Sequence, residues 1–332
     1  MWRQVGQAAG GSRKGRAVYP KCVDEASRRV DMLCPMDPIP APPPAPVRHA
    51  LVLGGTGPIG TSLLARLLAA GWSVDALSRT PPPDGPQLRW HVGTFAAMPA
   101  TLPTRVDAVF SCGPLDLFSH WYAGAALDCA RVIAFGSTSD ATKQDAADPA
   151  ERELAQRLRD SGARVFAAAA ARGAAATLLR PTLVYGSGRD RNLSRIVALA
   201  RRSGVFVLPA DARGLRQPVH VEDLASAAHT VVDAAEAHGR SYALPGGETL
   251  DYRAMVARTL SCLEPRPRLW MLPGPLFDAA LWTAHRAGRL TGLPPGAVTR
   301  MREDLVFDAA PARAAFGYAP RPFRPEAGMF PG

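Results

Sequence analysis

The chain has 332 residues, 47% of them hydrophobic, and a formal net charge of +10 with 39 basic residues, nearly all arginine. This length and composition are enough for a large core and fit an α/β domain with an appended lobe. The sequence argues against three classes of protein. It has no nucleic-acid-binding module, no apolar run of about 18 residues that could form a membrane helix, and no spacing of residues typical of metal ligands.

Residues 1–46 are predicted to lie outside the fold. They carry a small excess of basic residues, lack the apolar segment of a secretory signal, and end in a proline-rich run over 38–46. We expect a disordered extension or translated sequence upstream of a start at Met36, with a partner-binding arm as the alternative. Five scattered cysteines without a CxxC pair indicate reduced thiols and a cytoplasmic protein.

A strand, a glycine turn, a helix and a second strand open the folded part. Ala50–Leu53 is an apolar run typical of a buried strand, and Gly54, Gly57 and Gly60 follow at three-residue spacing. An amphipathic helix and a strand over Trp72–Leu77 complete a βαβ unit of the dinucleotide-binding type. Backbone N–H groups at a helix N-terminus must approach a diphosphate closely, which requires glycine. A glycine turn without a ligand is the alternative.

The end of the second strand indicates which dinucleotide binds. NAD sites usually place an acidic residue there, whereas this chain has Ser78-Arg79. Asp75 lies in the middle of the strand and should point elsewhere by alternation. Because arginine can pair with a 2′-phosphate, we favour NADP over NAD. The alternative is that Arg79 is a solvated loop charge.

Further strands alternate with helices along the next hundred residues. The predicted strands are Gln87–Val92, Val106–Ser111, Arg131–Phe135 and Ala176–Leu179, and the predicted helices are Phe118–Cys129 and 149–172. This alternation predicts an α/β fold with a doubly wound parallel sheet, the Rossmann architecture. Ligands of such sheets bind at the carboxyl ends of the strands.

Past Tyr185 the alternation breaks, and we expect a smaller C-terminal substrate-binding lobe. The predicted ranges are 47–186 for the nucleotide-binding domain, with a return segment near 220–245, and 187–219 with 246–325 for the lobe.

Two segments of this lobe have unusual compositions. Residues 187–220 carry seven arginines, which together suggest an anionic substrate such as a pyrophosphate, although any single one is more simply a solvated charge. Residues 269–284 are strongly apolar, and we expect them to cap the lobe, with a membrane-surface helix as the alternative.

Six short motifs then occur in a fixed order. They are Gly54–Gly60, Gly136–Ser139, Leu179–Gly186, Arg191–Leu193, Arg216–Asp223 and Ala312–Pro320. Together they resemble the extended short-chain dehydrogenase/reductase family, in particular its NAD(P)-dependent epimerase/dehydratase group, which acts on nucleotide sugars. The likeness covers about residues 47–325.

The resemblance implies a role for each motif. Ser137 and Thr138 would orient a substrate carbonyl, Asn192 would contact the nucleotide of the sugar substrate, and Arg216 would hold its diphosphate. The cofactor would be bound by Gly54, Thr56, Gly57, Pro58, Ile59, Gly60 and Arg79, with Pro181 and Val184 at its nicotinamide end.

One departure from the family concerns catalysis. The family uses Tyr-x-x-x-Lys, but none of the six tyrosines here is followed by lysine four residues later. About where that pair should lie, the chain has Glu153 and Arg157; Arg157 could hold a ribose but cannot deprotonate as lysine does. Lys143 is the one lysine after the N-terminal extension, and it is our candidate proton donor.

Two hypotheses follow. The first is an NADP-dependent reductase or epimerase that acts on a nucleotide sugar or a similar anionic substrate, with a homodimer as an assembly that the sequence allows. The second is a catalytically silent NADP-binding sensor or assembly protein on the same fold. The missing Tyr-x-x-x-Lys favours the second, and the retained substrate motifs favour the first.

Overall fold

The computed structural model describes residues 47–190, 192–286 and 296–330. The predicted extension over 1–46 and Arg191 lie outside the described residues. Within the described part, no helix combines the length and the apolar character that a membrane span requires.

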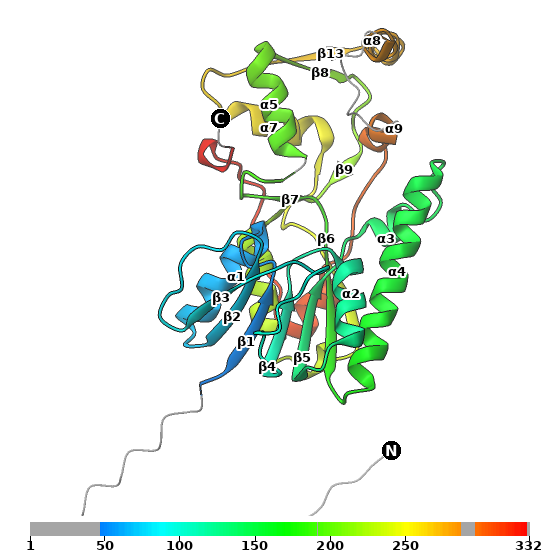
Figure 1. Ribbon diagram of the computed structural model, residues 1–332. Helices are drawn as coiled ribbons and strands as arrows, with labels where there is room; N and C mark the ends of the chain where they lie inside the picture. Colours follow the sequence, from blue (N-terminus) through cyan, green and yellow to red (C-terminus); the bar gives the residue numbers. More distant parts are fainter. Residues whose placement is uncertain (1–46, 191, 287–295, 331–332) are drawn as a thin grey trace, which may run out of the picture. The chain divides into compact units, whose positions relative to one another are not determined.

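A parallel sheet of seven strands forms the centre of the described chain (Figure 1). Every neighbouring pair of strands runs parallel. Their order across the sheet is β11 (Arg240–Leu244), β6 (Ala175–Pro181), β5 (Asp128–Phe135), β4 (Arg105–Ser111), β1 (His49–Leu53), β2 (Ser73–Ser78) and β3 (Leu88–Val92). The predicted doubly wound Rossmann sheet is therefore confirmed. Its topological switch point lies between β1 and β4, beside the glycine turn.

Helices cover both faces of this sheet because its strands are apolar on both sides. Ala50 and Val52 of β1 face one core with α1 (Pro58–Ala69) and α6 (Val221–Val231). Leu51 and Leu53 face the other core, which contains residues of α2 (Leu115–Gly124) and α4 (Pro149–Ala170). A short helix, α3 (Ser139–Thr142), lies between β5 and α4 in the sequence and packs against α4. A 22-residue helix fits the Ala-, Arg- and Glu-rich stretch, with Asp148 capping its N-terminus.

One predicted helix was wrong at its end. The helix expected over Phe118–Cys129 stops at Gly124, and β5 already begins at Asp128. Cys129 pairs with Val106 of β4 and is buried, whereas Ala130 is exposed, as strand alternation requires. The apolar residues there fit both the helical period and the strand period, so the pairing of β5 with β4 decides the structure.

A third core lies under part of the remaining chain, whereas Ala312 and Phe316 of the later helix α10 (Ala310–Phe316) belong to the first core, that of α1 and α6. The members of the third core include Leu193, Val197, Met255 and Leu260, contributed by α5 (Leu193–Ser203) and α7 (Tyr252–Ser261). Three short strand pairs connect these helices: β7 (Val184–Tyr185) with β10 (Val219–His220), β9 (Leu215–Arg216) with β12 (Leu250–Asp251), and β8 (Val205–Pro209) with β13 (Arg268–Leu272). The later helices are α8 (Gly274–Arg286), α9 (Gly296–Arg302) and α10 (Ala310–Phe316). Two 3-10 turns are η1 (Ala235–Ala237) and η2 (Ala327–Met329). The predicted ranges 47–186, 187–219 and 246–325 stay predictions.

The apolar segment 269–284 is not one helix. Its first residues form β13, and a separate helix, α8, follows. Trp270, Leu276 and Trp282 expose 54%, 60% and 61% of their surface, respectively. The expected capping role of this segment stays a prediction.

Candidate functional site

The glycine turn lies at the carboxyl end of β1 and leads into α1. Gly54 has φ +82°, and its carbonyl oxygen accepts a hydrogen bond from the Gly57 N–H at 2.9 Å. A Cβ on Gly60 would come within 2.2 Å of the same oxygen, so only glycine lets the helix start this close to the strand. Pro58 occupies the first turn, and the first N–H groups of α1 have no partner within the helix. Such groups fit an anion such as a diphosphate.

Ser78 and Arg79 stand beside this turn in different ways. The Ser78 hydroxyl is 2.7 Å from the Thr56 hydroxyl and accepts a hydrogen bond from the Thr80 N–H at 3.2 Å. Arg79 is exposed and makes no hydrogen bond or ion pair with the described residues. An unpaired guanidinium at this corner fits the proposed 2′-phosphate contact.

Asp75 is bound away from this corner. Its two carboxylate oxygens each lie 2.5 Å from a histidine Nε2, one from His49 and one from His91. This arrangement follows the strand alternation that the sequence predicted for Asp75.

A second arginine reaches the glycine turn from a distant part of the sequence. Arg189, which follows β7, donates a hydrogen bond from Nη1 to the Thr56 carbonyl oxygen at 2.9 Å. The sequence grouped Arg189 with the arginines of the substrate segment, because no local pattern shows a contact across 133 positions. The structure instead brings it to the candidate cofactor turn.

A cavity of about 520 Å³ opens beside the carboxyl ends of β5 and β6. All five residues predicted to act in catalysis or to bind the substrate line this cavity: Ser137, Thr138, Lys143, Asn192 and Arg216. The other lining residues are Ser139, Thr142, Thr182, Leu183, Arg195, Ile196, Leu199, Phe206, Gln217, Tyr252, Met255, Arg300, Met301, Leu305 and Phe307.

The charges of this cavity all have one sign. Lys143, Arg195, Arg216 and Arg300 line it, and no aspartate or glutamate is among its described lining residues. Positive side chains that converge in a concave site attract an anionic ligand. Arg195 makes no hydrogen bond or ion pair with the described residues, so its guanidinium is available to a ligand.

The two predicted carbonyl-orienting hydroxyls have different partners. Thr138 is 7% exposed, and its hydroxyl donates to the Pro181 carbonyl oxygen at 3.2 Å. Ser137 donates to the Ser139 hydroxyl at 3.1 Å and accepts the Ser139 N–H at 3.2 Å. A hydroxyl–hydroxyl bond can be redirected to a ligand more easily than a buried bond to the backbone. Ser137 is therefore the better candidate to contact a substrate oxygen.

Pro181 and Val184, expected at the nicotinamide end of the cofactor, lie outside the cavity, and their cofactor role stays a prediction. Pro181 ends β6 and is buried, and Val184 packs against the core shared by α1 and α6. Neither lines the 520 Å³ cavity, whereas the intervening Thr182 and Leu183 do.

Arg216 is only 4% exposed and is held by backbone oxygens. Its Nη1 donates to the carbonyls of Leu215 and Glu303, each at 2.7 Å, and its Nη2 donates to the carbonyl of Arg300. Its guanidinium also lies 5.3 Å from the centre of the Tyr252 ring. Burial lowers the pKa of Arg216. Arg216 thus fastens the segment after α9 to β9 and presents only part of its guanidinium to the cavity.

Asn192 lies at the start of α5, where Asp190 caps the helix. The Asp190 carboxylate accepts the N–H groups of Asn192 and Ser194 at 3.1 and 3.0 Å. The cavity is lined by Asn192, Arg195, Ile196 and Leu199, which share one helix face by their spacing. The cap thereby sets the orientation of the face that carries Asn192.

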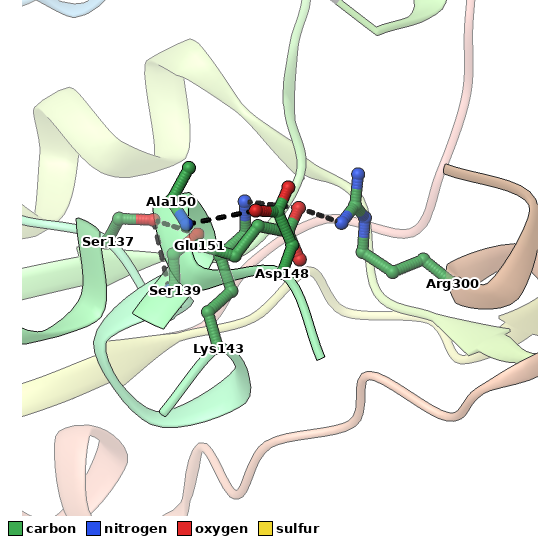
Figure 2. Close-up of polar contacts among 7 residues, drawn as sticks. All are labelled: Ser137, Ser139, Lys143, Asp148, Ala150, Glu151 and Arg300. Carbon is green, nitrogen blue, oxygen red and sulfur yellow. Dashed lines mark hydrogen bonds and ion pairs between the residues drawn. The ribbon is translucent and has the colours of Figure 1, made fainter. Parts of the chain in front are cut away.

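Lys143 belongs to a cluster that the sequence did not predict (Figure 2). Its Nζ lies 3.2 Å from Oε1 of Glu151, and the same oxygen forms an ion pair with Arg300. Burial raises the pKa of Glu151, but the hydrogen bond from Lys143 and the charge of Arg300 outweigh it and leave the pKa below its usual value. Glu151 is therefore a carboxylate at neutral pH.

The pair expected in place of Tyr-x-x-x-Lys lies elsewhere. Glu153 and Arg157 are exposed on α4 and border a separate hollow with Asp116 and His120 of α2. Glu151, two residues earlier, is the residue of α4 that reaches Lys143. A helix turns by 100° per residue, so two residues that are two positions apart, such as Glu151 and Glu153, point to opposite faces of α4.

Comparisons with known proteins agree with the motifs. Residues 161–244 match the model of the NAD dependent epimerase/dehydratase family. No curated protein matches the sequence. The resemblance to this family that the motifs predicted is confirmed on that stretch.

Solved structures share the fold at low sequence identity. Epimerase Mth375 from Methanothermobacter thermautotrophicus has a TM-score of 0.62 at 16% identity, covering 83% of this chain and 88% of its own. UDP-glucuronic acid 4-epimerase from Bacillus cereus, solved with NAD, has a TM-score of 0.61 at 11% identity, covering 82% and 93%. MoeE5 with UDP-glucuronic acid and NAD has a TM-score of 0.60 at 18% identity, covering 82% and 94%.

Proposed function

We propose that this chain is an NADP-dependent oxidoreductase for a nucleotide sugar. The proposal starts from the match of residues 161–244 to the NAD dependent epimerase/dehydratase family. The substrate would be an anionic sugar derivative with a carbonyl or hydroxyl group at the reacting position. NAD is the alternative cofactor, since the solved epimerase of Bacillus cereus was crystallised with it.

The observation that carries this proposal is the convergence in one cavity. Ser137 at the end of β5 and four cations line the same space of about 520 Å³. A hydroxyl at the carboxyl end of a parallel sheet and a positive surface are what a carbonyl joined to a diphosphate requires. The similar fold of MoeE5, solved with UDP-glucuronic acid, supports the same ligand class.

The residues of the glycine turn fit a dinucleotide. Gly54 to Gly60 and the first N–H groups of α1 would hold its diphosphate, and Arg79 would hold its 2′-phosphate. Arg189 would support the turn through its hydrogen bond to the Thr56 carbonyl oxygen. When bound, the cofactor supplies hydride transfer at its nicotinamide.

The protein's own side chains would orient the substrate and handle its proton. The Ser137 hydroxyl, released from Ser139, would donate to the substrate oxygen and polarise the carbonyl. Lys143 is the candidate proton donor on the same wall of the cavity. Tyr252 also lines the cavity, but burial raises its pKa and its ring packs against Arg216, so it is a poor substitute for the family's tyrosine.

Turnover of a substrate panel tests this function. Purified protein is incubated with NADPH or NADH and 4-keto nucleotide sugars, and absorbance of the reduced nicotinamide is followed. We expect consumption of NADPH with at least one substrate. Calorimetry with both dinucleotides in both redox states accompanies the assay, and a complete absence of binding contradicts the proposal.

The second candidate is the catalytically silent NADP-binding protein. The observation in its favour is that none of the six tyrosines is followed by a lysine four residues later, so the family's catalytic pair is missing. Clear binding of NADPH by calorimetry, with no consumption by any substrate of the panel, would favour this role over the enzyme.

A further inference from the structure

A carboxylate is already bound at the Ser137 end of the cavity, and it belongs to the protein itself (Figure 2). Oxygen Oε1 of Glu151 contacts both Lys143 Nζ and Arg300 Nη1. Glu151 begins the first turn of α4, whereas Arg300 comes from α9. The Lys143 and Arg300 side chains line the cavity, and Glu151 is not among its lining residues. Glu151 therefore approaches the two cations from behind the cavity wall.

The two cations keep binding capacity after this contact. An ammonium group has three N–H donors and a guanidinium has five. Each cation contacts Glu151 through one nitrogen, Nζ of Lys143 and Nη1 of Arg300. The side chains are 19% and 25% exposed, so they are shielded from bulk water but reachable from the cavity. Two positive charges against one negative leave this corner with a net positive charge.

The cations of the cavity come from different parts of the chain. Arg195 on α5 and Arg216 on β9 belong to the elements whose motifs imply contacts with nucleotide and diphosphate. Lys143 follows Ser137 by six residues on the wall formed after β5, where the sugar carbonyl is proposed to lie. Arg300 is linked to both groups, because its side chain shares Glu151 with Lys143 and its carbonyl oxygen accepts a hydrogen bond from Arg216. Lys143 therefore lies where a charged group on the sugar itself would come.

We propose that Lys143 and Arg300 form a binding site for a carboxylate on the sugar ring of the substrate. Glu151 holds the two cations from behind the cavity wall, and its negative charge competes with a substrate carboxylate that approaches them from the cavity. The inference rests on the proposed function and narrows its substrate class to acidic nucleotide sugars. A carboxylate is favoured over a further phosphate because the pair already holds a carboxylate.

Glu151 is then an internal competitor, and this has a measurable consequence. Glu151→Gln removes the negative charge at nearly constant size, so both cations become available to a ligand. The readout is the ratio of dissociation constants for UDP-glucose and UDP-glucuronic acid, which differ in having a hydroxymethyl or a carboxylate group. We expect this ratio to rise about tenfold in Glu151→Gln, the effect of one gained charged hydrogen bond.

Calorimetry on the full chain measures both ligands with wild type and variants. Adding Arg300→Gln to Glu151→Gln should bring the ratio back to about its wild-type value, because one half of the site is gone. Arg302→Gln is the matched control: Arg302 also lies on α9 but pairs with Asp211 and Asp278 and does not line the cavity. It should leave the ratio unchanged. Should Glu151→Gln not fold, Arg300→Gln alone must lower the wild-type ratio.

An unchanged ratio in Glu151→Gln, with UDP-glucose still bound, overturns the carboxylate site and leaves the proposed function standing. A ratio that Arg302→Gln lowers as much as Arg300→Gln does also overturns it, because the effect would then be one of general charge. If neither sugar nucleotide nor any dinucleotide binds the wild-type protein, the proposed function itself fails.

Discussion

At the scale of single residues, neighbouring hydroxyls that look equivalent in the sequence have different tasks. Ser137 and Thr138 both follow β5, yet Thr138 donates to the buried backbone of Pro181 and Ser137 donates to another hydroxyl. The motif Gly-Ser-Thr-Ser does not distinguish them, because the difference depends on which carbonyl β6 places opposite. Only the tertiary contact separates a structural hydroxyl from a functional one.

We expect Ser137→Ala and Thr138→Ala to fail in different ways. Ser137→Ala should lower kcat by about 100-fold through loss of the carbonyl's donor, with the melting temperature unchanged. Thr138→Ala should cost about 1 kcal/mol of stability through the lost hydrogen bond, with a small change in kcat. Steady-state kinetics and thermal unfolding of both variants measure this. The reverse pattern would assign the substrate contact to Thr138.

The two arginines at the glycine turn predict distinct effects on cofactor affinity. Arg189→Gln should weaken NADP and NAD equally, by about tenfold, because Arg189 contacts the turn that would hold the diphosphate common to both. Arg79→Gln should weaken NADP alone, since only NADP has a 2′-phosphate. Calorimetric titration with both dinucleotides tests this, with Arg195→Gln in the substrate cavity as the control. Equal loss of both cofactors in Arg79→Gln would contradict the assignment.

At the scale of elements, the first turn of α6 depends on the charge state of a histidine. His220 caps α6: its Nδ1 accepts the Glu222 N–H at 3.2 Å, which requires the neutral ring. His220 is buried, and burial together with the charge of Arg321 lowers its pKa. Protonation would convert the accepting nitrogen into a donor and abolish the cap.

The sign of the resulting pH dependence follows from this shift. Because the pKa is lower in the folded state than in the unfolded chain, the stabilising effect is complete above about pH 6.5 and is lost as pH falls through the folded-state value. The melting temperature of wild type should therefore fall between about pH 6.5 and 5 more steeply than that of His220→Asn, whose amide oxygen keeps the cap without titrating. Parallel curves for the two proteins would show that His220 does not contribute.

The sequence predicted elements best where one signal was decisive. The glycine spacing, the apolar strands and the family motifs predicted the βαβ unit and the parallel sheet, because burial on both faces leaves a clear pattern. The end of α2 was mispredicted where apolar residues fit two periods. Ser137, Asn192 and Arg216 were proposed from motifs and Lys143 as the one lysine after the N-terminal extension, and all four line one cavity. Glu151, Arg300 and Arg189 were not, since their roles arise from contacts between segments far apart in the chain.

At the scale of the whole molecule, the chain leaves the sheet and later returns to it. The edge strand β11 pairs with β6, but the residues of α5, β8 and β9 lie between these two strands in the sequence. The helix α6, which packs against α1 on the same face as β1's Ala50 and Val52, also comes from this later part. The nucleotide-binding layer is therefore built from two separate stretches of chain.

This interleaving limits how the protein can be dissected. A fragment that stops at residue 186 loses β11 and α6, so β6 becomes an open edge with unpaired backbone groups, and one apolar face loses its cover. We expect that fragment to aggregate on expression, as light scattering would reveal, whereas a fragment over 47–186 joined by a short linker to 220–245 should remain dispersed. A cut after residue 186 would therefore remove two elements, β11 and α6, on which the nucleotide-binding sheet depends.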